Sequence, residues 1–69
     1  MVKYVLLYDI PREEKVLQVK VNRKLHSIDA EKIQHSVWES KKLEELKDIA
    51  KLIKQKGGEA IILEEKIIY

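Results

Sequence analysis

Apolar residues along this 69-residue chain follow two kinds of pattern, and the first predicts strands. Residues 3–10 (KYVLLYDI) form a nearly unbroken apolar run that ends at Pro11, as expected of a central strand buried on both faces. Residues 59–64 (EAIILE) predict a short buried strand, and residues 66–69 (KIIY) predict the start of another. Residues 31–39 (EKIQHSVWE) alternate between apolar and polar positions without Gly, Pro or Asn, which predicts one long or kinked strand.

Residues 12–27 show the second pattern, a helical spacing. Their apolar stripe has intervals of four, four and three, and it consists of Leu17, Val21, Leu25 and Ile28. The stretch from Leu17 to Val21 also alternates like a strand. Pro11 fits a first helical turn, and Glu13 and Glu14 fall where a helix dipole stabilises carboxylates, so the helix is favoured.

Residues 40–56 predict a second helix with a wider apolar stripe. Its main positions recur at intervals of three and four, and they are Leu43, Leu46, Ala50 and Ile53. Ser40 can cap the start of this helix, and Gly57 can end it in a left-handed conformation. The remaining positions carry intermixed Lys, Glu and Asp, which indicates a surface helix.

In chain order these segments read β-α-β-α-β-β, which predicts one α+β domain over residues 1–69. We expect a small sheet with both helices on one face, because right-handed connections place successive helices on the same side. The other sheet face is then uncovered, and an exposed apolar face on a small domain marks an interface. Since the chain has no Cys for a disulfide or thiolate zinc site, self-association is the expected source of extra stability.

The charge adds one feature to this picture. There are 14 Lys and Arg against 12 Asp and Glu, a net charge of +2. An excess of basic residues lies in residues 12–24, which contain Arg12, Lys15, Lys20, Arg23 and Lys24 against two Glu. Doubled in a dimer, this segment would form a strip able to follow phosphates. No apolar run approaches the ~20 residues that span a bilayer. The first residues do not resemble a signal peptide, so we expect a cytoplasmic protein without membrane contact.

Asp9 is the main candidate for chemistry, because it follows the buried strand where the chain leaves the sheet. Two interpretations stay open: a cap for the following helix or turn, or a ligand for Mg²⁺ or Mn²⁺. One Asp per chain is too few for a strong site, but two Asp9 side chains across a two-fold axis would suffice. Such a cation would activate water for phosphodiester hydrolysis. His26 and His35 are candidates for proton transfer, and Trp38 for packing in the core or a dimer interface.

Two short motifs resemble a known family. Tyr8-Asp9-Ile10 and the later segment 33–39 (IQHSVWE) are similar to the "YDI" and "Q-x-S-V-aromatic-E" motifs of the small CRISPR-associated "Cas-two" proteins. The resemblance covers residues 3–64 and implies a ferredoxin-like sandwich, with a small antiparallel sheet that forms a homodimer through its sheets. It also implies a metal-dependent endonuclease acting on single-stranded RNA or duplex DNA, a dimeric scaffold that bridges two copies of an integrase partner in spacer acquisition, or both.

The resemblance also assigns roles to residues. It makes Asp9 the ligand of the catalytic Mg²⁺ or Mn²⁺, shared across the dimer axis, with Tyr8 beside it. Lys32 lies where some members have Arg, and Lys20 and Arg23 are the nearest substitutes for arginines of the first helix. Two alternatives remain: a non-enzymatic adaptor dimer that binds nucleic acid, and a toxin-type ribonuclease of the related ferredoxin-like "Vap" group.

Overall fold

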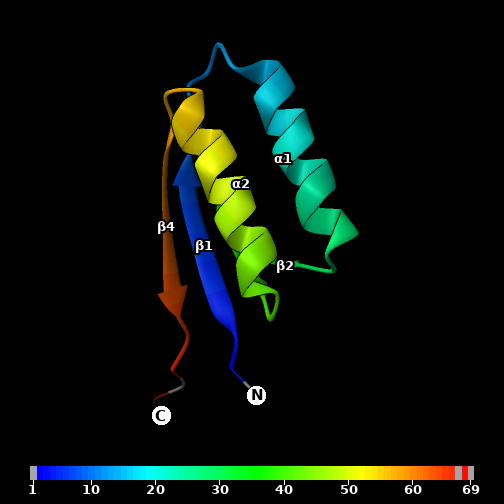
Figure 1. Ribbon diagram of the computed structural model, residues 1–69, viewed down its shortest axis with the longest axis vertical. Coiled ribbons are helices and arrows are strands. Elements are labelled where there is room, and N and C mark those ends of the chain that lie inside the picture. The colour runs from blue at the N-terminus through cyan, green and yellow to red at the C-terminus, as the bar shows by residue number, and fades with distance from the viewer. Residues whose placement is uncertain (1, 67, 69) are drawn as a thin grey trace.

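The computed structural model describes residues 2–66 and 68, and its elements follow in the order β-α-β-β-α-β (Figure 1). This α+β order corrects the predicted β-α-β-α-β-β. The elements are β1 (Tyr4–Asp9), α1 (Lys15–Ser27), β2 (Glu31–Gln34), β3 (Val37–Ser40), α2 (Leu43–Gln55) and β4 (Glu59–Glu64).

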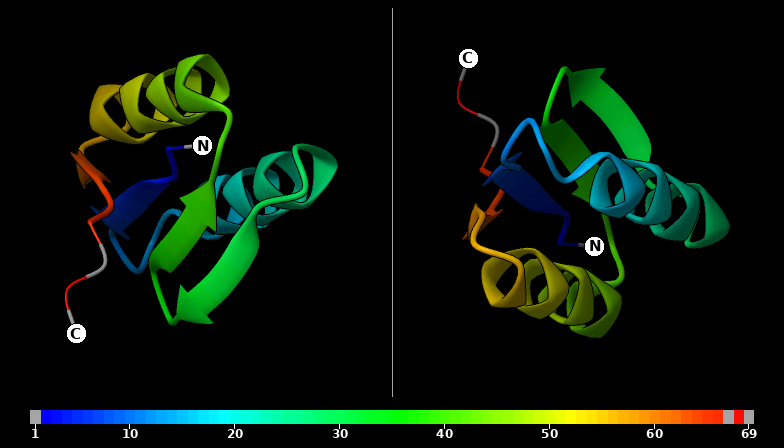
Figure 2. Two further views of the ribbon diagram at one scale, coloured as in Figure 1. Left: turned by 90° about the horizontal axis from the view of Figure 1, so that it is seen from below. Right: turned by 90° about the horizontal axis from the view of Figure 1, so that it is seen from above.

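The four strands form one antiparallel sheet in the order β2-β3-β1-β4, and both helices lie on one of its faces (Figure 2). This arrangement is compatible with a ferredoxin-like fold. The prediction that β1 is a central strand is confirmed, since it pairs with both β3 and β4. The prediction that β1 is buried on both faces was wrong, because the helices cover one face and Leu6 alone is fully buried.

The segment predicted as one strand, residues 31–39, is instead a hairpin of β2 and β3. His35 and Ser36 form the turn, and Ser36 has a φ of 66°, a left-handed value that few residues other than glycine adopt. The Ser36 carbonyl accepts a hydrogen bond of 3.2 Å from the backbone N–H of Tyr8 in β1. The single-strand prediction failed because this turn uses a serine where sequence patterns lead one to look for Gly or Asn.

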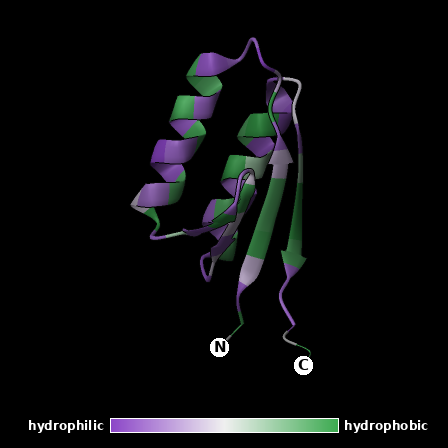
Figure 3. Cartoon of the chain, turned by 180° about the vertical axis from the view of Figure 1, so that it is seen from behind, coloured by the Kyte–Doolittle hydropathy of each residue, from purple (hydrophilic) through white to green (hydrophobic). Residues whose placement is uncertain are grey.

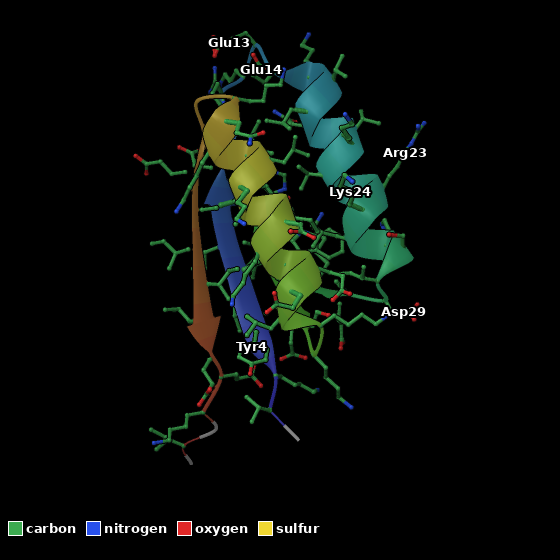
Figure 4. All side chains as sticks on the ribbon, viewed as in Figure 1. Tyr4, Glu13, Glu14, Arg23, Lys24 and Asp29 are labelled. Atoms are coloured by element: carbon green, nitrogen blue, oxygen red, sulfur yellow. The ribbon has the colours of Figure 1, made fainter. Side chains whose placement is uncertain are left out.

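Helix α1 begins at Lys15, three residues later than predicted. Pro11 and Glu14 belong to the preceding turn, where the Glu14 N–H donates a 2.9 Å hydrogen bond to the Pro11 carbonyl. Glu13 and Glu14 therefore lie ahead of the first turn of the helix, at the top of the view in Figure 4. Pro11 ends the β1 segment but does not start the helix.

Helix α2 also begins later than predicted, at Leu43. Ser40 is the last residue of β3, and its Oγ accepts a 3.1 Å hydrogen bond from the Lys42 N–H in the connecting turn. At the other end the prediction is confirmed, since Gly57 takes a left-handed φ of 88° directly after the helix. The described residues form two helices, α1 and α2, of 13 residues each. Neither helix is long and apolar enough to cross a bilayer.

The apolar core lies between the helices and the covered sheet face. The sheet contributes Leu6, Trp38 and Ala60, and the helix stripes contribute Leu17, Val21, Leu25, Leu46, Ile49, Ala50 and Ile53. Trp38 is 1% exposed, which confirms its predicted packing in the core. Its indole N–H has no hydrogen-bond partner among the described residues, and the His26 ring packs edge-on against it at 5.3 Å between centroids.

Apolar side chains also occupy the sheet face opposite the helices, as predicted. Strand alternation places Val5, Leu7, Val37, Ile61 and Leu63 there, and we call this set the open sheet face. Ile61 and Leu63 on β4 are 59% and 53% exposed. Figure 3, seen from behind, shows how apolar β1 and β4 are along most of their length. The further strand predicted at residues 66–69 lies partly outside the described residues; Lys66 and Ile68, which are described, belong to no strand.

Candidate nucleic-acid interface

A polar groove of about 250 Å³ lies beside the C-terminal end of β1. Three segments supply its walls: the end of β1 with the loop that follows it, the middle of α1, and the β2–β3 hairpin. Its lining residues are Tyr8, Asp9, Ile10, Arg12, Gln18, Asn22, Lys32, His35 and Ser36. We call this hollow the Asp9 groove.

The hairpin holds one side of the Asp9 groove in place. The 3.2 Å hydrogen bond between the Tyr8 N–H and the Ser36 carbonyl ties the hairpin turn to β1, one residue before Asp9. Because Ser36 takes a left-handed φ, the turn is tight and carries His35 to the groove. The end of β1 is thereby attached to its neighbour on the β3 side.

The connection between α2 and β4 fixes the other side of Asp9. Gly58 lies so close to β1 that an added Cβ would stand 2.6 Å from the Asp9 carbonyl oxygen and 2.6 Å from Cγ2 of Ile53. The Gly58 N–H also donates a 2.9 Å hydrogen bond to the Ile53 carbonyl at the end of α2. The backbone of Asp9 is thus held between the hairpin and the end of α2.

The Asp9 side chain is exposed and accepts no hydrogen bond from any residue that the structure describes. The interpretation of Asp9 as a cap for the following helix or turn was therefore wrong. The carboxylate lines the Asp9 groove and also borders the hollow on the β4 side, next to Glu59 and Ile61. It is free to bind a ligand from solvent.

Glu59 on β4 is the direct cross-strand partner of Asp9. Two carboxylates in such a pair repel each other, so a cation between them is favourable. Magnesium is commonly held by one or two protein carboxylates together with water and substrate phosphates. Within residues 2–66 and 68, no three His, Asp or Glu side chains are grouped closely enough to hold a metal ion. The oxygen donors at Asp9 and Glu59 therefore fit Mg²⁺ chemically, but one chain supplies only part of a site.

The structure brings five of the residues singled out from the sequence into the Asp9 groove: Tyr8, Asp9, Arg12, Lys32 and His35. Three further basic candidates, Lys15, Lys20 and Arg23, line a separate hollow on α1. His26, the other histidine, packs against Trp38. The basic residues near the first helix thus form two surfaces.

Gln18 and Asn22 line the Asp9 groove but did not stand out in the sequence. They are four residues apart on α1, so they share a helix face next to the buried stripe. An amide side chain can donate and accept hydrogen bonds at once, which suits phosphate oxygens and base edges alike. The spacing of four was the one signal that sequence reasoning had available.

A second charged cluster lies at the far end of β1. Lys3 Nζ contacts the Glu39 carboxylate at 3.2 Å, and Glu65 shares a hydrogen bond with Glu39. The pKa of Glu65 is raised, chiefly by this hydrogen bond with the Glu39 carboxylate. The pKa of Glu39 is lowered by hydrogen bonds from Glu65 and Lys3, and the pKa of Lys3 is raised by its bond to Glu39. The three side chains thus form a charged cluster at the opposite end of β1 from the Asp9 groove.

The chain matches no known protein-family model, no curated protein and no solved structure. Asp9 belongs to the first of the two sequence motifs, and two residues of the second motif, His35 and Ser36, line the same groove.

Proposed function

We propose that this protein binds nucleic acid in the Asp9 groove and hydrolyses phosphodiester bonds with Mg²⁺ or Mn²⁺, in the manner of the "Cas-two" proteins that it resembles. One observation carries the proposal: Arg12 and Lys32 line the same groove as Asp9, an exposed residue whose carboxylate accepts no hydrogen bond from the described part of the chain. Cations that bind phosphate oxygens beside a carboxylate that binds a divalent ion are the components that phosphoryl chemistry requires.

Each groove residue then has a chemical task. The planar guanidinium of Arg12 can bind two oxygens of one phosphate, and Lys32 acts as a compact positive charge on the same strand of nucleic acid. When bound, the metal ion supplies Lewis-acid polarisation and a water of lowered pKa. Asp9 would hold that ion with Tyr8 beside it. His35 lines the same groove at the hairpin turn and would move a proton to or from the reacting phosphate.

A homodimer would complete the metal site. Asp9 follows Leu7 on the same side of β1, so it lies at the border of the open sheet face. Two copies that pack through this face about a two-fold axis would double every residue near the axis, including the carboxylate. The dimer would also present two equivalent sides to an integrase partner in the cytoplasm, which is the scaffold role that the resemblance implies.

The test compares Asp9→Asn with Glu59→Gln and the unmodified chain on single-stranded RNA and on duplex DNA. With Mg²⁺ or Mn²⁺ present, we expect cleavage by the unmodified chain and a loss of about 100-fold or more in Asp9→Asn. Glu59→Gln should retain part of the activity, because it removes a neighbouring carboxylate and leaves Asp9 in place. A chelator should stop all cleavage, and cleavage by Asp9→Asn at the unmodified rate would refute the mechanism.

A non-enzymatic adaptor is the second candidate. It is favoured by the absence of any group of three metal-ligating side chains among the described residues, since Arg12 and Lys32 can bind phosphate without a metal. In this case the unmodified chain cleaves nothing, and Asp9→Asn binds DNA with unchanged affinity. Arg12→Glu and Lys32→Glu should weaken binding, with a smaller dependence on salt concentration. No observation favours the toxin-type ribonuclease over these two.

A further inference from the structure

A second basic surface lies on the outer side of α1, apart from the Asp9 groove. Two valines form its centre, with Val16 82% and Val19 51% exposed. Lys15, Lys20 and Arg23 surround them, and together these five side chains line a shallow hollow of about 410 Å³. We call this surface the valine patch.

The valine patch faces away from the core. Its positions repeat at helical spacing, but they fall on the side of α1 opposite the buried Leu17, Val21 and Leu25. Figure 4 shows Arg23 extending outward from α1, on the side away from α2. The alkyl parts of the Lys and Arg side chains extend the apolar surface, while their charged ends reach solvent.

Among the residues that the structure describes, no basic side chain of α1 forms an ion pair. Its sequence, KVLQVKVNRKLHS, contains Lys15, Lys20, Arg23 and Lys24 and no Asp or Glu. The ion pairs formed by the described residues lie elsewhere, between Lys3 and Glu39 and between Glu44 and Lys47. Like charges three and four residues apart on a helix repel each other. An anionic ligand bound to α1 would offset this repulsion.

The apolar centre decides which kind of anion fits. A phosphate backbone gains little from valine methyl groups, and nucleic-acid bases stack on aromatic or Arg side chains rather than on valine. Aliphatic side chains of a protein, in contrast, gain free energy when they cover Val16 and Val19. β-branched residues also have a lower helix propensity than many alternatives, so two exposed valines do not serve the helix itself.

We propose that the valine patch docks a partner protein through a segment that carries Leu or Ile at helical spacing and Asp or Glu on both sides. The aliphatic anchors would cover the valines, and the carboxylates would pair with Lys15, Lys20 and Arg23. This surface is separate from the Asp9 groove, so one chain can bind the partner and nucleic acid at the same time. The docking does not depend on whether the Asp9 groove binds or cleaves nucleic acid.

The test uses a fluorescein-labelled peptide of about 18 residues, or five helical turns, with Leu at intervals of three and four and Glu elsewhere. Anisotropy titrations compare it with a peptide in which Ser replaces each Leu, and with a single-stranded DNA of equal charge. We expect the full-length chain to bind the Leu peptide at least about tenfold more tightly than the Ser peptide. Val16→Ser/Val19→Ser, which keeps every charge, should weaken the Leu peptide by at least about tenfold and leave DNA binding unchanged.

Three controls separate the outcomes. Val2→Ser alters an exposed valine outside the patch and should leave peptide affinity unchanged. Lys20→Glu/Arg23→Glu, which keeps both valines, should abolish peptide binding, and Asp9→Asn should have no effect on it even if nucleic-acid cleavage is lost. Peptide affinity that does not respond to the valine substitutions, or no peptide binding at all, would overturn the proposal. A DNA affinity that falls together with peptide affinity would assign the patch to nucleic acid instead.

Discussion

Helices α1 and α2 have equal lengths but opposite ways of carrying charge. Each has 13 residues, and α2 balances Lys47, Lys51 and Lys54 with three acidic side chains, including Glu44 at 3.3 Å from Lys47. Helix α1 carries four basic residues and no acidic one. Helix α2 buries four residues and exposes no large apolar side chain, whereas α1 buries three and exposes Val16 and Val19.

The difference separates a helix that serves folding from one that also serves binding. Intermixed charges on α2 keep its outer face soluble and allow weak pairing within the helix. On α1, the basic side chains form no ion pair with any described residue, and their mutual repulsion and the exposed valines do not stabilise the fold. The two helices therefore allow matched substitutions, in which the same chemical change is expected to have different consequences.

The largest expected effects are in the core. Leu46 in α2 and Leu25 in α1 are both fully buried, so Leu46→Ala and Leu25→Ala remove the same atoms. We expect each to lower the free energy of unfolding by about 2–5 kcal/mol. Leu46→Ala should cost more, because α2 packs against both β1 and β4 and the cavity there has less room to collapse (Figure 1). Urea denaturation measures both, and a greater loss in Leu25→Ala would contradict this ranking of the helices.

The next effect concerns the two glycines after α2. Gly58→Ala forces a methyl group against the Asp9 carbonyl and Ile53, which should cost about 1–3 kcal/mol. Gly57→Ala meets no atom within 4 Å and pays only for its left-handed φ, so about 1 kcal/mol is expected. Thermal unfolding gives both values. Amide NMR shifts of β1 should change in Gly58→Ala and stay constant in Gly57→Ala; unchanged β1 shifts in both variants would argue against the contact.

A smaller effect should differ in sign between the helices. Lys20→Gln in α1 removes repulsion from Arg23 and Lys24, so we expect stability to rise by about 0.2–0.5 kcal/mol. Glu44→Gln in α2 removes the pair with Lys47 in the first turn, so stability should fall by about the same amount. Each substitution removes one charge and leaves the same neutral side chain, Gln. Denaturant titrations at low salt measure both changes in the free energy of unfolding. If the two changes have the same sign, the proposed difference in charge pairing between α1 and α2 is wrong.

The smallest effect lies outside both helices, in the Lys3, Glu39 and Glu65 network. The lowered pKa of Glu39 gives stability above the usual glutamate pKa, which is lost as the pH falls. The raised pKa of Glu65 acts in reverse: its contribution is present in acid and lost as the pH rises through that raised pKa. Glu65→Gln donates to Glu39 at every pH, so its melting temperature relative to that of the unmodified chain should rise as the pH increases above about pH 4. Identical melting profiles from acid to neutral pH would contradict the shared proton.

The sequence predicted the buried stripes well because periodicity reports burial directly. The stripe from Leu17 to Leu25 is buried. Residues 59–64 form β4 with the predicted bounds, but the prediction that this strand is buried was wrong, because only Ala60 of β4 is buried and the side chains on its other face are exposed. The hairpin could not be anticipated, since Ser36 takes a left-handed conformation that serine seldom adopts and is held there by a hydrogen bond to β1. That bond joins residues distant in sequence, and no local pattern reports it.

The candidate site was foreseen in part. Asp9 at the end of a central strand, with Arg12 and Lys32 nearby, followed from the chain leaving the sheet and from the motifs. Gln18 and Asn22 were not foreseen, because a spacing of four between two polar residues is common on the exposed part of any helix. Arg12 and Lys20 line different hollows because α1 begins at Lys15, so Arg12 lies in the turn before the helix. The start of a helix depends on turn geometry, which residue propensities describe poorly.

The contact at Gly58 has a consequence for anyone who would redesign this groove. Gly58 lies between the Asp9 carbonyl and Ile53, where not even a methyl group fits. The C-terminal end of α2 and the end of β1 are therefore packed tightly together. Side chains on the hairpin and on α1 can be exchanged to retune selectivity without moving the carboxylate. Position 58 does not tolerate a side chain, so a library of groove variants should keep Gly58 unchanged.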